Sequence, residues 1–322
     1  MKSNDKLAEG RIQRLDNRMT NQLRTIADAD HDRQKLIGSS DVAGILGISP
    51  WKTQLAVYLD KIQPRDDEPD RSKARIFARG KRMEPYVVDM LAEEMGLVIV
   101  GRGNRYMDAE LPFLAAEIDA ETEDGRNVEI KTVSPFKAFE WGEQQTDAIP
   151  VHYTAQAMHG LMVTGRAVCI FGVLIGGDDF RIYHVERDDE TIDAIRRKEV
   201  EFWARVQHRD PPDPSTTSDV LALFERDTGR AVEADIATVQ AIDRLREIRG
   251  KLKSLEKEQD ELKASVHRYM QDAASLTYDG QSLATWKAQS ANRFDLQAFT
   301  EAHPDLAAQF RTVSHSRVFR LR

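Results

Sequence analysis

Two carboxylates and one amine are spaced for joint chemistry in the segment Leu114–Pro135, whose sequence is LAAEIDAETEDGRNVEIKTVSP. Two apolar runs flank a polar turn with an Asp-Gly dipeptide, a pattern that predicts a β-hairpin. Because strand side chains alternate between two faces, Glu129 and Lys131 share a face, with Cα atoms about 6.6 Å apart. Asp119 lies on the first strand, so folding back at the turn brings its carboxylate beside Glu129. We therefore expect two acids and an amine on a strand pair whose other face is apolar.

This group of side chains suits the hydrolysis of a phosphodiester. Mg²⁺ binds carboxylate oxygens, keeps several waters and takes further ligands from substrate phosphate. Two such cations about 3.5–4 Å apart can serve the attacking and leaving oxygens together, and an ammonium group beside the water helps to hold the nucleophile. The alternative is a solvent-exposed strand in which Glu129 and Lys131 form a simple charge pair. The spacing of Asp119, Glu129 and Lys131 taken alone favours this simple charge pair. The neighbouring segments instead favour the metal-dependent hydrolysis of a phosphodiester.

A possible phosphate site precedes the hairpin. Ser39, Ser40 and Asp41 are good N-caps for a helix that begins at this point, and a helix N-terminus attracts anions. Arg33 stands seven residues before Ser40 and could add charge-assisted hydrogen bonds to a phosphate. Ser40 taken alone is more often only a cap.

The segment Arg71–Met95 predicts one helix or two, and its first half is basic. Arg71–Arg82 carries six basic residues and no acidic one, so Arg79 and Arg82 could contact DNA, although a solvated helix face has the same pattern. Glu84 follows these residues, and its plain role would be a salt-bridge partner. We expect short strands at 97–100 and from Arg105, separated by a turn at 101–103.

A helix over 151–165 places Tyr153, Gln156 and Gly160 on one face by their spacing. His152 and His159 also lie nearly on one face, but no third ligand is nearby, so we expect no metal there. The run 167–175 is continuously apolar and predicts a buried strand.

Composition describes a soluble globular protein, with 41% hydrophobic and 31% charged residues. The net charge of −8 argues against a uniformly basic nucleic-acid binder but leaves room for a local basic channel. The single cysteine, Cys169, excludes an intrachain disulfide. No apolar run approaches the roughly 18 residues of a membrane span, and the N-terminus lacks the apolar core of a secretory signal. We expect no membrane association and a cytoplasmic location in a bacterial or phage-infected cell.

Taken together, the sequence resembles the YqaJ-type viral recombinase nucleases, relatives of phage lambda exonuclease in the PD-(D/E)XK superfamily. The resemblance covers about residues 31–208. Four blocks appear in the family's order: Arg33–Gly47 (RQKLIGSSDVAGILG), Arg79–Glu84 (RGKRME), Asp119 with Glu129-Ile130-Lys131, and Tyr153–Gln156 (YTAQ).

The resemblance implies an α/β (α+β) fold with a restriction-endonuclease-like core, in which helices flank a central mixed sheet. It implies a Mg²⁺-dependent deoxyribonuclease, with Mn²⁺ as an expected substitute, that acts in recombination as a 5′-to-3′ exonuclease on double-stranded DNA ends by a two-metal mechanism. By the same resemblance, the chain forms a homo-oligomer, a ring-shaped trimer in the family, and works with a single-strand annealing protein.

The resemblance also implies roles for individual residues. Asp119, Glu129 and the Ile130 carbonyl would hold the metal, with Glu84 supporting it directly or through a water. Lys131 would orient the attacking water, and Gln156 would position the nucleophile or the scissile strand. Phosphate or DNA contacts would come from five residues: Arg33, Ser39, Ser40, Arg79 and Arg82.

One departure concerns the first metal acid. The family often has Pro-Asp or Ser-Pro-Asp there, whereas this chain has Glu117-Ile118-Asp119. Strand alternation puts Glu117 on the same face as Asp119, which makes Glu117 an auxiliary acid or a decoy.

We expect an N-terminal arm at 1–30, the nuclease domain at 31–210 and a linker at 211–229 marked by three prolines. The remainder, 230–322, would be a helical, coiled-coil and small α/β extension, because apolar residues recur at threes and fours from Ile236 to Val266. We also expect a last strand at 313–321.

Two alternatives to the exonuclease remain. An endonuclease or nickase of the same fold would cut covalently closed circular DNA, which an enzyme that needs an end leaves intact. A non-catalytic DNA-binding or assembly subunit would use the C-terminal helix, but it would have no need for Asp119, Glu129 and Lys131 together.

Overall fold

The computed structural model describes residues 33–63, 71–313 and 316–322. The chain divides into two compact units, of which the first ends at Val220 and the second runs from Leu221 to Arg322. The division lies inside the segment 211–229 that the prolines indicated as a linker, and helix α7 (Thr217–Leu223) crosses it. The expected boundaries of the domains stay a prediction.

The first unit is built on a mixed β-sheet. Its main path runs β1 (Ile37–Gly38), β3 (Leu114–Thr122), β4 (Asn127–Val133), β5 (Val168–Ile175) and β6 (Asp179–Glu186), and β2 (Ile99–Met107) also pairs with β3. The β1–β3 and β4–β5 pairs are parallel, and the other pairs are antiparallel. The continuous apolar run predicted as a buried strand is β5, which is buried along nearly its whole length.

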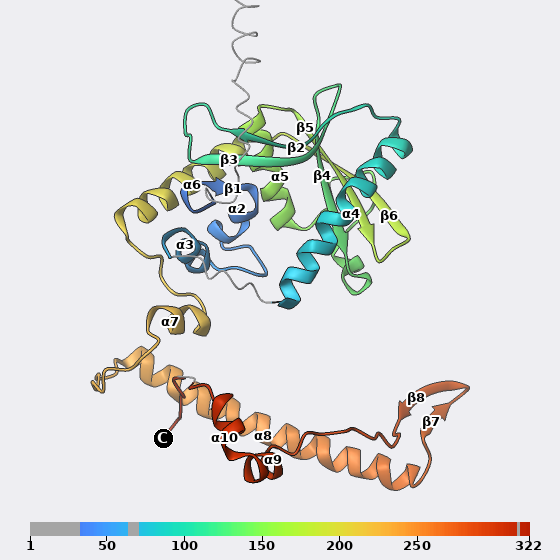
Figure 1. Ribbon diagram of the computed structural model, residues 1–322, viewed down its shortest axis with the longest axis vertical. Helices are drawn as coiled ribbons and strands as arrows, with labels where there is room; N and C mark the ends of the chain where they lie inside the picture. The colour runs from blue at the N-terminus through green and yellow to red at the C-terminus, as the bar shows by residue number, and fades with distance from the viewer. Residues whose placement is uncertain (1–32, 64–70, 314–315) are drawn as a thin grey trace, which may run out of the picture. The chain divides into compact units, whose positions relative to one another are not determined.

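Helices cover both faces of this sheet (Figure 1). The helical segments of the first unit are η1 (Arg33–Lys35), α2 (Ser39–Ile45), α3 (Gln54–Ile62), α4 (Arg71–Met95), η2 (Pro135–Glu140), α5 (Val151–Thr164) and α6 (Asp189–His208). On β4, Val128 and Ile130 pack against α4, whereas the alternate residues Glu129 and Lys131 contact α5. The expected α/β architecture, a central mixed sheet flanked by helices, is confirmed.

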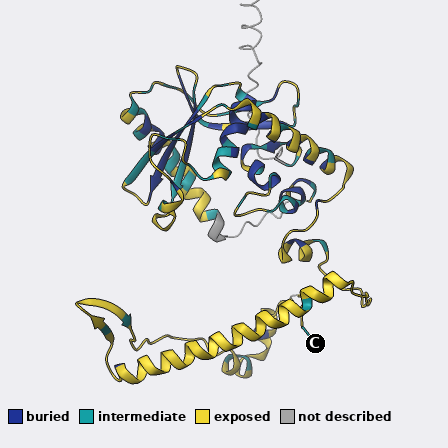
Figure 2. Cartoon of the chain, turned by 180° about the vertical axis from the view of Figure 1, so that it is seen from behind, coloured by how far each residue is buried: buried dark blue, intermediate teal, exposed yellow. Residues whose placement is uncertain are grey.

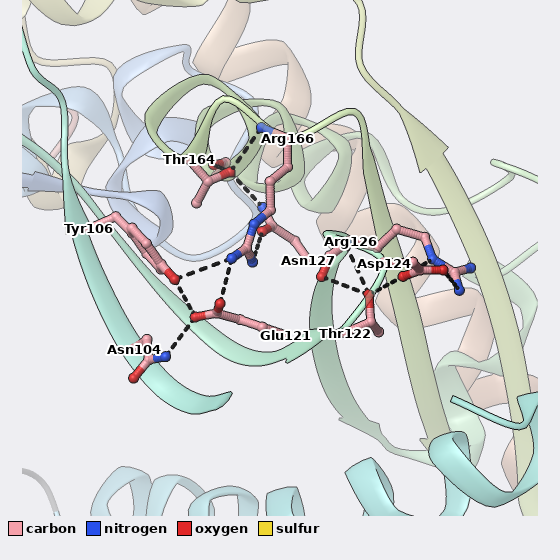
Figure 3. Close-up of polar contacts among 10 residues, drawn as sticks. Asn104, Tyr106, Glu121, Thr122, Asp124, Arg126, Asn127, Thr164 and Arg166 are labelled. Atoms are coloured by element: carbon pink, nitrogen blue, oxygen red, sulfur yellow. Dashed lines mark hydrogen bonds and ion pairs between the residues drawn. The ribbon is translucent and has the colours of Figure 1, made fainter. Parts of the chain in front are cut away.

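A buried polar cluster ties the closed end of the β3–β4 hairpin to the end of α5 (Figure 3). Glu121 accepts hydrogen bonds from Asn104 at 2.7 Å, from the Tyr106 hydroxyl and from the Arg166 guanidinium. Arg166 also donates to the Asn127 side chain at 3.0 Å. Because these partners come from β2, β3, β4 and the loop after α5, the cluster fixes the hairpin that carries the predicted site.

Two local expectations were wrong. The residues 101–103 form no turn between two strands, because β2 is continuous across them, and its bulge against β3 lies between Ile99 and Gly101. The residues Ser39 and Ser40 are not the N-cap of α2, because Gly38 occupies that position and Asp41 accepts its N–H at 3.1 Å. Ser39 and Ser40 are therefore the first residues of the helix.

The second unit is built around α8 (Ile236–Met270), the long helix that the apolar repeat predicted. It also contains the hairpin of β7 (Ser275–Tyr278) and β8 (Gln281–Thr285), followed by α9 (Leu296–Ala302) and α10 (Pro304–Gln309). The expected last strand is wrong, because no strand occurs among the described residues after Thr285. Figure 2 shows α8 exposed along almost all of its length.

Candidate active site

The residues predicted to do chemistry surround one cavity of about 410 Å³. Its wall includes eight of the predicted site residues: Ser39, Ser40, Glu84, Asp119, Glu129, Ile130, Lys131 and Gln156. They come from α2, α4, β3, β4 and α5. Segments more than 100 residues apart in the chain thus meet at a single polar hollow.

The cavity opens where β3 and β4 separate. Only two residue pairs, Ala120–Val128 and Glu121–Asn127, are in register between these strands, whereas β4 stays paired with β5 over its full length. Just beyond the last pair, Oδ2 of Asp119 accepts a hydrogen bond from the Ile130 N–H at 2.8 Å. A carboxylate therefore takes the place of a strand carbonyl, and the strands diverge around it.

Glu129 and Lys131 contact each other as the period of two predicted. Lys131 Nζ lies 2.5 Å from Oε1 of Glu129, and Gln156 Nε2 donates to the same oxygen at 2.6 Å. The Lys131 ammonium also lies 5.0 Å from the centre of the Tyr153 ring, a cation–π contact. The face of α5 that the spacing of Tyr153 and Gln156 indicated therefore contacts Glu129 and Lys131 of β4.

The electrostatics of the cavity favour a bound cation. Burial raises the pKa of Glu129 to about 7; the Lys131 ammonium opposes this rise, and the Asp119 carboxylate adds a smaller rise. Burial likewise raises the pKa of Asp119 against the opposing effect of Lys131. Burial alone would lower the pKa of Lys131, but the carboxylates of Glu129 and Asp119 outweigh it and raise that pKa. Two crowded acids share one ammonium, so additional positive charge would stabilise both.

The donor set fits a hard divalent cation. Asp119, Glu129 and the Ile130 backbone supply oxygen atoms, which Mg²⁺ prefers, and none of the cavity residues offers a soft thiolate. Within the described part of the chain, no three His, Cys, Asp or Glu side chains form a ready metal cluster. A cation here would need the backbone carbonyl, waters and substrate phosphate as further ligands, which is the habit of Mg²⁺.

Two further acidic residues, Glu84 and Glu117, line the cavity with Asp119. Glu84 accepts hydrogen bonds from Lys81 at 3.1 and 3.2 Å, and burial followed by the charge of Asp119 raises the pKa of Glu84. Glu117 lies 3.7 Å from Lys81 and 3.9 Å from Arg105. Glu117 thus faces the cavity, as alternation predicted, but pairs with cations on its rim.

Three cationic residues that the sequence did not single out also line the cavity. Lys52, Lys61 and Arg105 line it with Ser39 and Ser40. Lys61 lies 2.6 Å from Asp41, and Lys52 lies 2.5 Å from Asp60. No local signal marks these three residues, because each is an ordinary member of its helix, loop or strand until the chain folds.

The structure does not place three of the predicted phosphate-binding residues at the cavity. The Arg33 side chain lies outside the described residues, although its backbone belongs to η1. Arg79 and Arg82 are exposed on α4 and do not line the cavity, whereas Gly80 and Glu84 of the same helix do. Their contacts with DNA stay predictions.

Comparisons with known proteins agree with one another. Residues 30–167 match the family described as "YqaJ-like viral recombinase domain". The Bacillus subtilis (strain 168) protein named "Uncharacterized protein YqaJ" is 29% identical over 297 residues, which cover 89% of this chain and 91% of that protein. That share of the chain is large enough to extend past Val220 into the second unit.

Solved structures give weaker similarity. The alkaline exonuclease LHK-Exo from Laribacter hongkongensis has 17% identity and a TM-score of 0.43, over 56% of this chain and 92% of that chain. A phage related exonuclease from Haemophilus somnus 129PT has 12% identity and a TM-score of 0.40, over 54% and 94%. No helix among the described residues is long and apolar enough to cross a bilayer.

Proposed function

We propose that this chain, whose residues 30–167 match the YqaJ-like viral recombinase domain, is a metal-dependent deoxyribonuclease that hydrolyses phosphodiester bonds. The observation that carries the proposal is the meeting of Asp119, Glu129 and Lys131 at one cavity, where the two acids have raised pKa values. A purely structural strand pair has no reason to bury two carboxylates and an ammonium together, because burying charge costs free energy.

Each residue then has a defined task. Asp119, Glu129 and the Ile130 carbonyl would hold divalent cations, with Glu84 supporting them directly or through water. A cation bound there would lower the pKa of a water and neutralise charge on the phosphate, and a pair of cations would do so on both sides of the scissile bond. Lys131 would hold the attacking water, because Glu129 and the Tyr153 ring fix its ammonium group. Gln156 would keep the Glu129 carboxylate in place.

We propose duplex DNA ends as the substrate and a 5′-to-3′ exonuclease as the activity. Support comes from the basic residues of the cavity lining, Lys52, Lys61 and Arg105, which accompany Ser39 and Ser40. A phosphate held there would lie in the same hollow as the proposed metal ligands. The two-metal mechanism, the use of Mg²⁺, the trimer, the annealing partner and the cytoplasmic location are parts of the same proposal.

The test uses end-labelled linear duplex and covalently closed circular duplex, each incubated with Mg²⁺ and with excess chelator. We expect the wild type to degrade the linear DNA only with Mg²⁺ and to leave the circle intact. Lys131→Ala should degrade linear DNA at least about 100-fold more slowly, since it loses the group that holds the nucleophile. Lys137→Ala is the matched control, because Lys137 is exposed, pairs with Glu140 at 3.1 Å and does not line the cavity.

The outcomes separate the alternatives. Cutting of the closed circle would assign an endonuclease or nickase to the same site. Full digestion of linear DNA by Lys131→Ala would remove Lys131 from the mechanism. DNA binding without any hydrolysis by the wild type would favour a non-catalytic subunit.

A further inference from the structure

An apolar stripe runs along α8 in the second unit. It consists of six residues: Leu245, Ile248, Leu252, Leu255, Leu262 and Val266. Between 39% and 62% of each of these residues is exposed to solvent. Figure 2 shows α8 exposed along almost all of its length, and none of the six residues is buried. We call these six residues the heptad stripe.

The spacing of the heptad stripe is that of a coiled coil. Steps of three and four alternate from Leu245 to Val266, with the polar Gln259 in the one position that completes the series. A strict repeat of seven keeps one seam facing a partner helix, whereas a helix lying on a globular core follows a period nearer 3.6. A single polar residue in such a seam commonly fixes the register of the partners.

The second unit also lacks a core of its own. Among its described residues only Met270 and Ala307 are buried. A unit of about 100 residues is stabilised by apolar burial, and association with another chain is one way to supply it. The heptad stripe is a regular apolar surface available for such burial.

The charges beside the stripe identify the partner. In a parallel pair of α8 helices, Lys251 faces Glu256 of the second copy and Glu258 faces Lys263. Arg244 would face Arg249 and is the exception. In an antiparallel pair, Lys251 faces Glu258 and Arg249 faces Glu256. Self-pairing therefore places opposite charges together in either direction.

DNA is a poorer occupant of this surface. The helix Ile236–Met270 contains eight Lys or Arg and six Asp or Glu residues, a nearly balanced set. Phosphate binding requires a predominance of basic groups, and an apolar seam contributes nothing to it. A groove beside α8, lined by Leu255, Leu262 and Val266 with Ala284 of β8, is likewise shaped for apolar side chains.

We propose that the heptad stripe of α8 pairs with the heptad stripe of a second copy of this chain, so that α8 is a self-association interface. The interface is independent of the nuclease site, and its test does not require DNA or metal.

The first test measures the mass of the full-length chain by analytical ultracentrifugation. The wild type is expected to sediment as an oligomer at micromolar concentration. The double variant Leu252→Lys with Leu255→Lys is expected to sediment as a smaller species that contains fewer copies of the chain. The control is Ser254→Lys with Ala264→Lys, which adds the same two charges at exposed positions outside the stripe. This control should keep the wild-type mass.

The helical circular dichroism signal gives a second readout. Association makes the melting midpoint rise with protein concentration. We expect this dependence in the wild type and in the control, and a weaker dependence in the stripe variant. A monomeric wild type, or a stripe variant with unchanged mass and melting behaviour, would overturn the proposal.

A charge swap tests the flanking contacts. Glu258→Lys should raise the dissociation constant about tenfold, because it turns two symmetry-related attractions into repulsions. Adding Lys263→Glu should restore affinity in a parallel pair, whereas adding Lys251→Glu should restore it in an antiparallel pair. Restoration by neither change would show that the second copy does not lie along the stripe.

Discussion

The carboxylate of Asp119 accepts a hydrogen bond from the backbone N–H of Ile130, with 2.8 Å between Oδ2 and the nitrogen. This bond joins the proposed metal acid to the residue whose carbonyl is proposed as a further ligand. It also satisfies a backbone donor that loses its strand partner where β3 and β4 separate. One side chain thus completes the sheet and lines the cavity.

Replacing Asp119 by Asn should separate these two tasks. The Asn carbonyl oxygen can still accept the Ile130 N–H, so we expect the melting temperature to change little. The lost charge should weaken divalent-cation binding, measured by calorimetry, and reduce DNA hydrolysis at least about 100-fold. Glu117→Gln is the matched control on the same strand and should retain activity within about tenfold. Equal losses in both variants would make Glu117 a metal ligand.

The chemistry of the site was predictable because its spacing is local. A period of two put Glu129 and Lys131 on one face of a strand, and a helical period put Tyr153 and Gln156 on one face of a helix; in the structure these two faces contact each other. Both rules depend only on backbone geometry. The topology of the sheet and the approach of α4 came from the family resemblance.

The predictions from sequence were wrong where one local sequence pattern is compatible with two different local structures. Two glycines around Arg102 are typical of a turn, but pairing with β3 keeps both of them within one continuous strand. The serines at 39 and 40 are typical caps, but Asp41 reaches back to Gly38 and makes Gly38 the cap. Arg105 gave no signal, because only the folded sheet places it at the cavity.

Arg105→Gln should weaken DNA binding more than turnover. The Arg105 side chain is largely buried at the cavity, its contact with Glu117 is long at 3.9 Å, and Nη1 has no hydrogen-bond partner among the described residues. A substrate phosphate would accept the hydrogen bond that Nη1 of Arg105 can donate. We expect KM to rise about tenfold with kcat nearly unchanged, and the slope of log affinity against log salt to fall by about 1.

Arg102→Gln on the same strand is the control for that measurement. Arg102 is paired with Asp89 at 2.5 Å and donates to the Pro85 carbonyl at 3.2 Å, away from the cavity. Its salt slope should equal that of the wild type. A lower kcat at unchanged KM in Arg105→Gln would assign Arg105 to the chemical step instead.

Glu121→Gln should lower stability through the cluster in Figure 3. Both Glu121 and its partner Arg166 are largely shielded from water, so removing one charge leaves the other without compensation. We expect a loss of about 2–4 kcal/mol in the free energy of unfolding by urea. Asp124→Asn is the control, because its pair with Arg126 at 2.5 Å is exposed, and it should cost less than about 0.5 kcal/mol.

The same variant has a defined pH dependence. Burial alone would raise the pKa of Glu121, but hydrogen bonds from Tyr106, Arg166 and Asn104 outweigh it and lower that pKa below 4.5. The charge therefore stabilises the fold above the ordinary pKa and loses this effect as pH falls through the lowered value. The difference in unfolding free energy between wild type and Glu121→Gln should be constant above about pH 5 and shrink in stronger acid. A difference that grew in acid would contradict the assignment.

His159 should titrate above its ordinary range. Its ring is fully buried, with Nδ1 2.6 Å from Glu199 and Nε2 2.9 Å from the carbonyl oxygen of Ala115. Both partners accept hydrogen bonds, so both ring nitrogens must carry protons. Burial alone would lower the pKa of His159, but the Glu199 carboxylate and the Ala115 carbonyl outweigh it and raise that pKa above 6.5.

This pair should make the first unit less stable at alkaline pH. A group whose pKa is higher in the folded state than in the unfolded state contributes its full stabilisation below the unfolded-state pKa. This stabilisation is lost as pH rises through the folded-state pKa. We expect the free energy of unfolding to fall as pH rises through that range, and less steeply in His159→Gln. An NMR titration of the wild type gives a test without any variant. His184, whose pKa burial and Arg126 lower, should lose its proton below pH 6.5 and His159 above it. If both rings titrated together, the buried ion pair joining α5 to α6 would be ruled out.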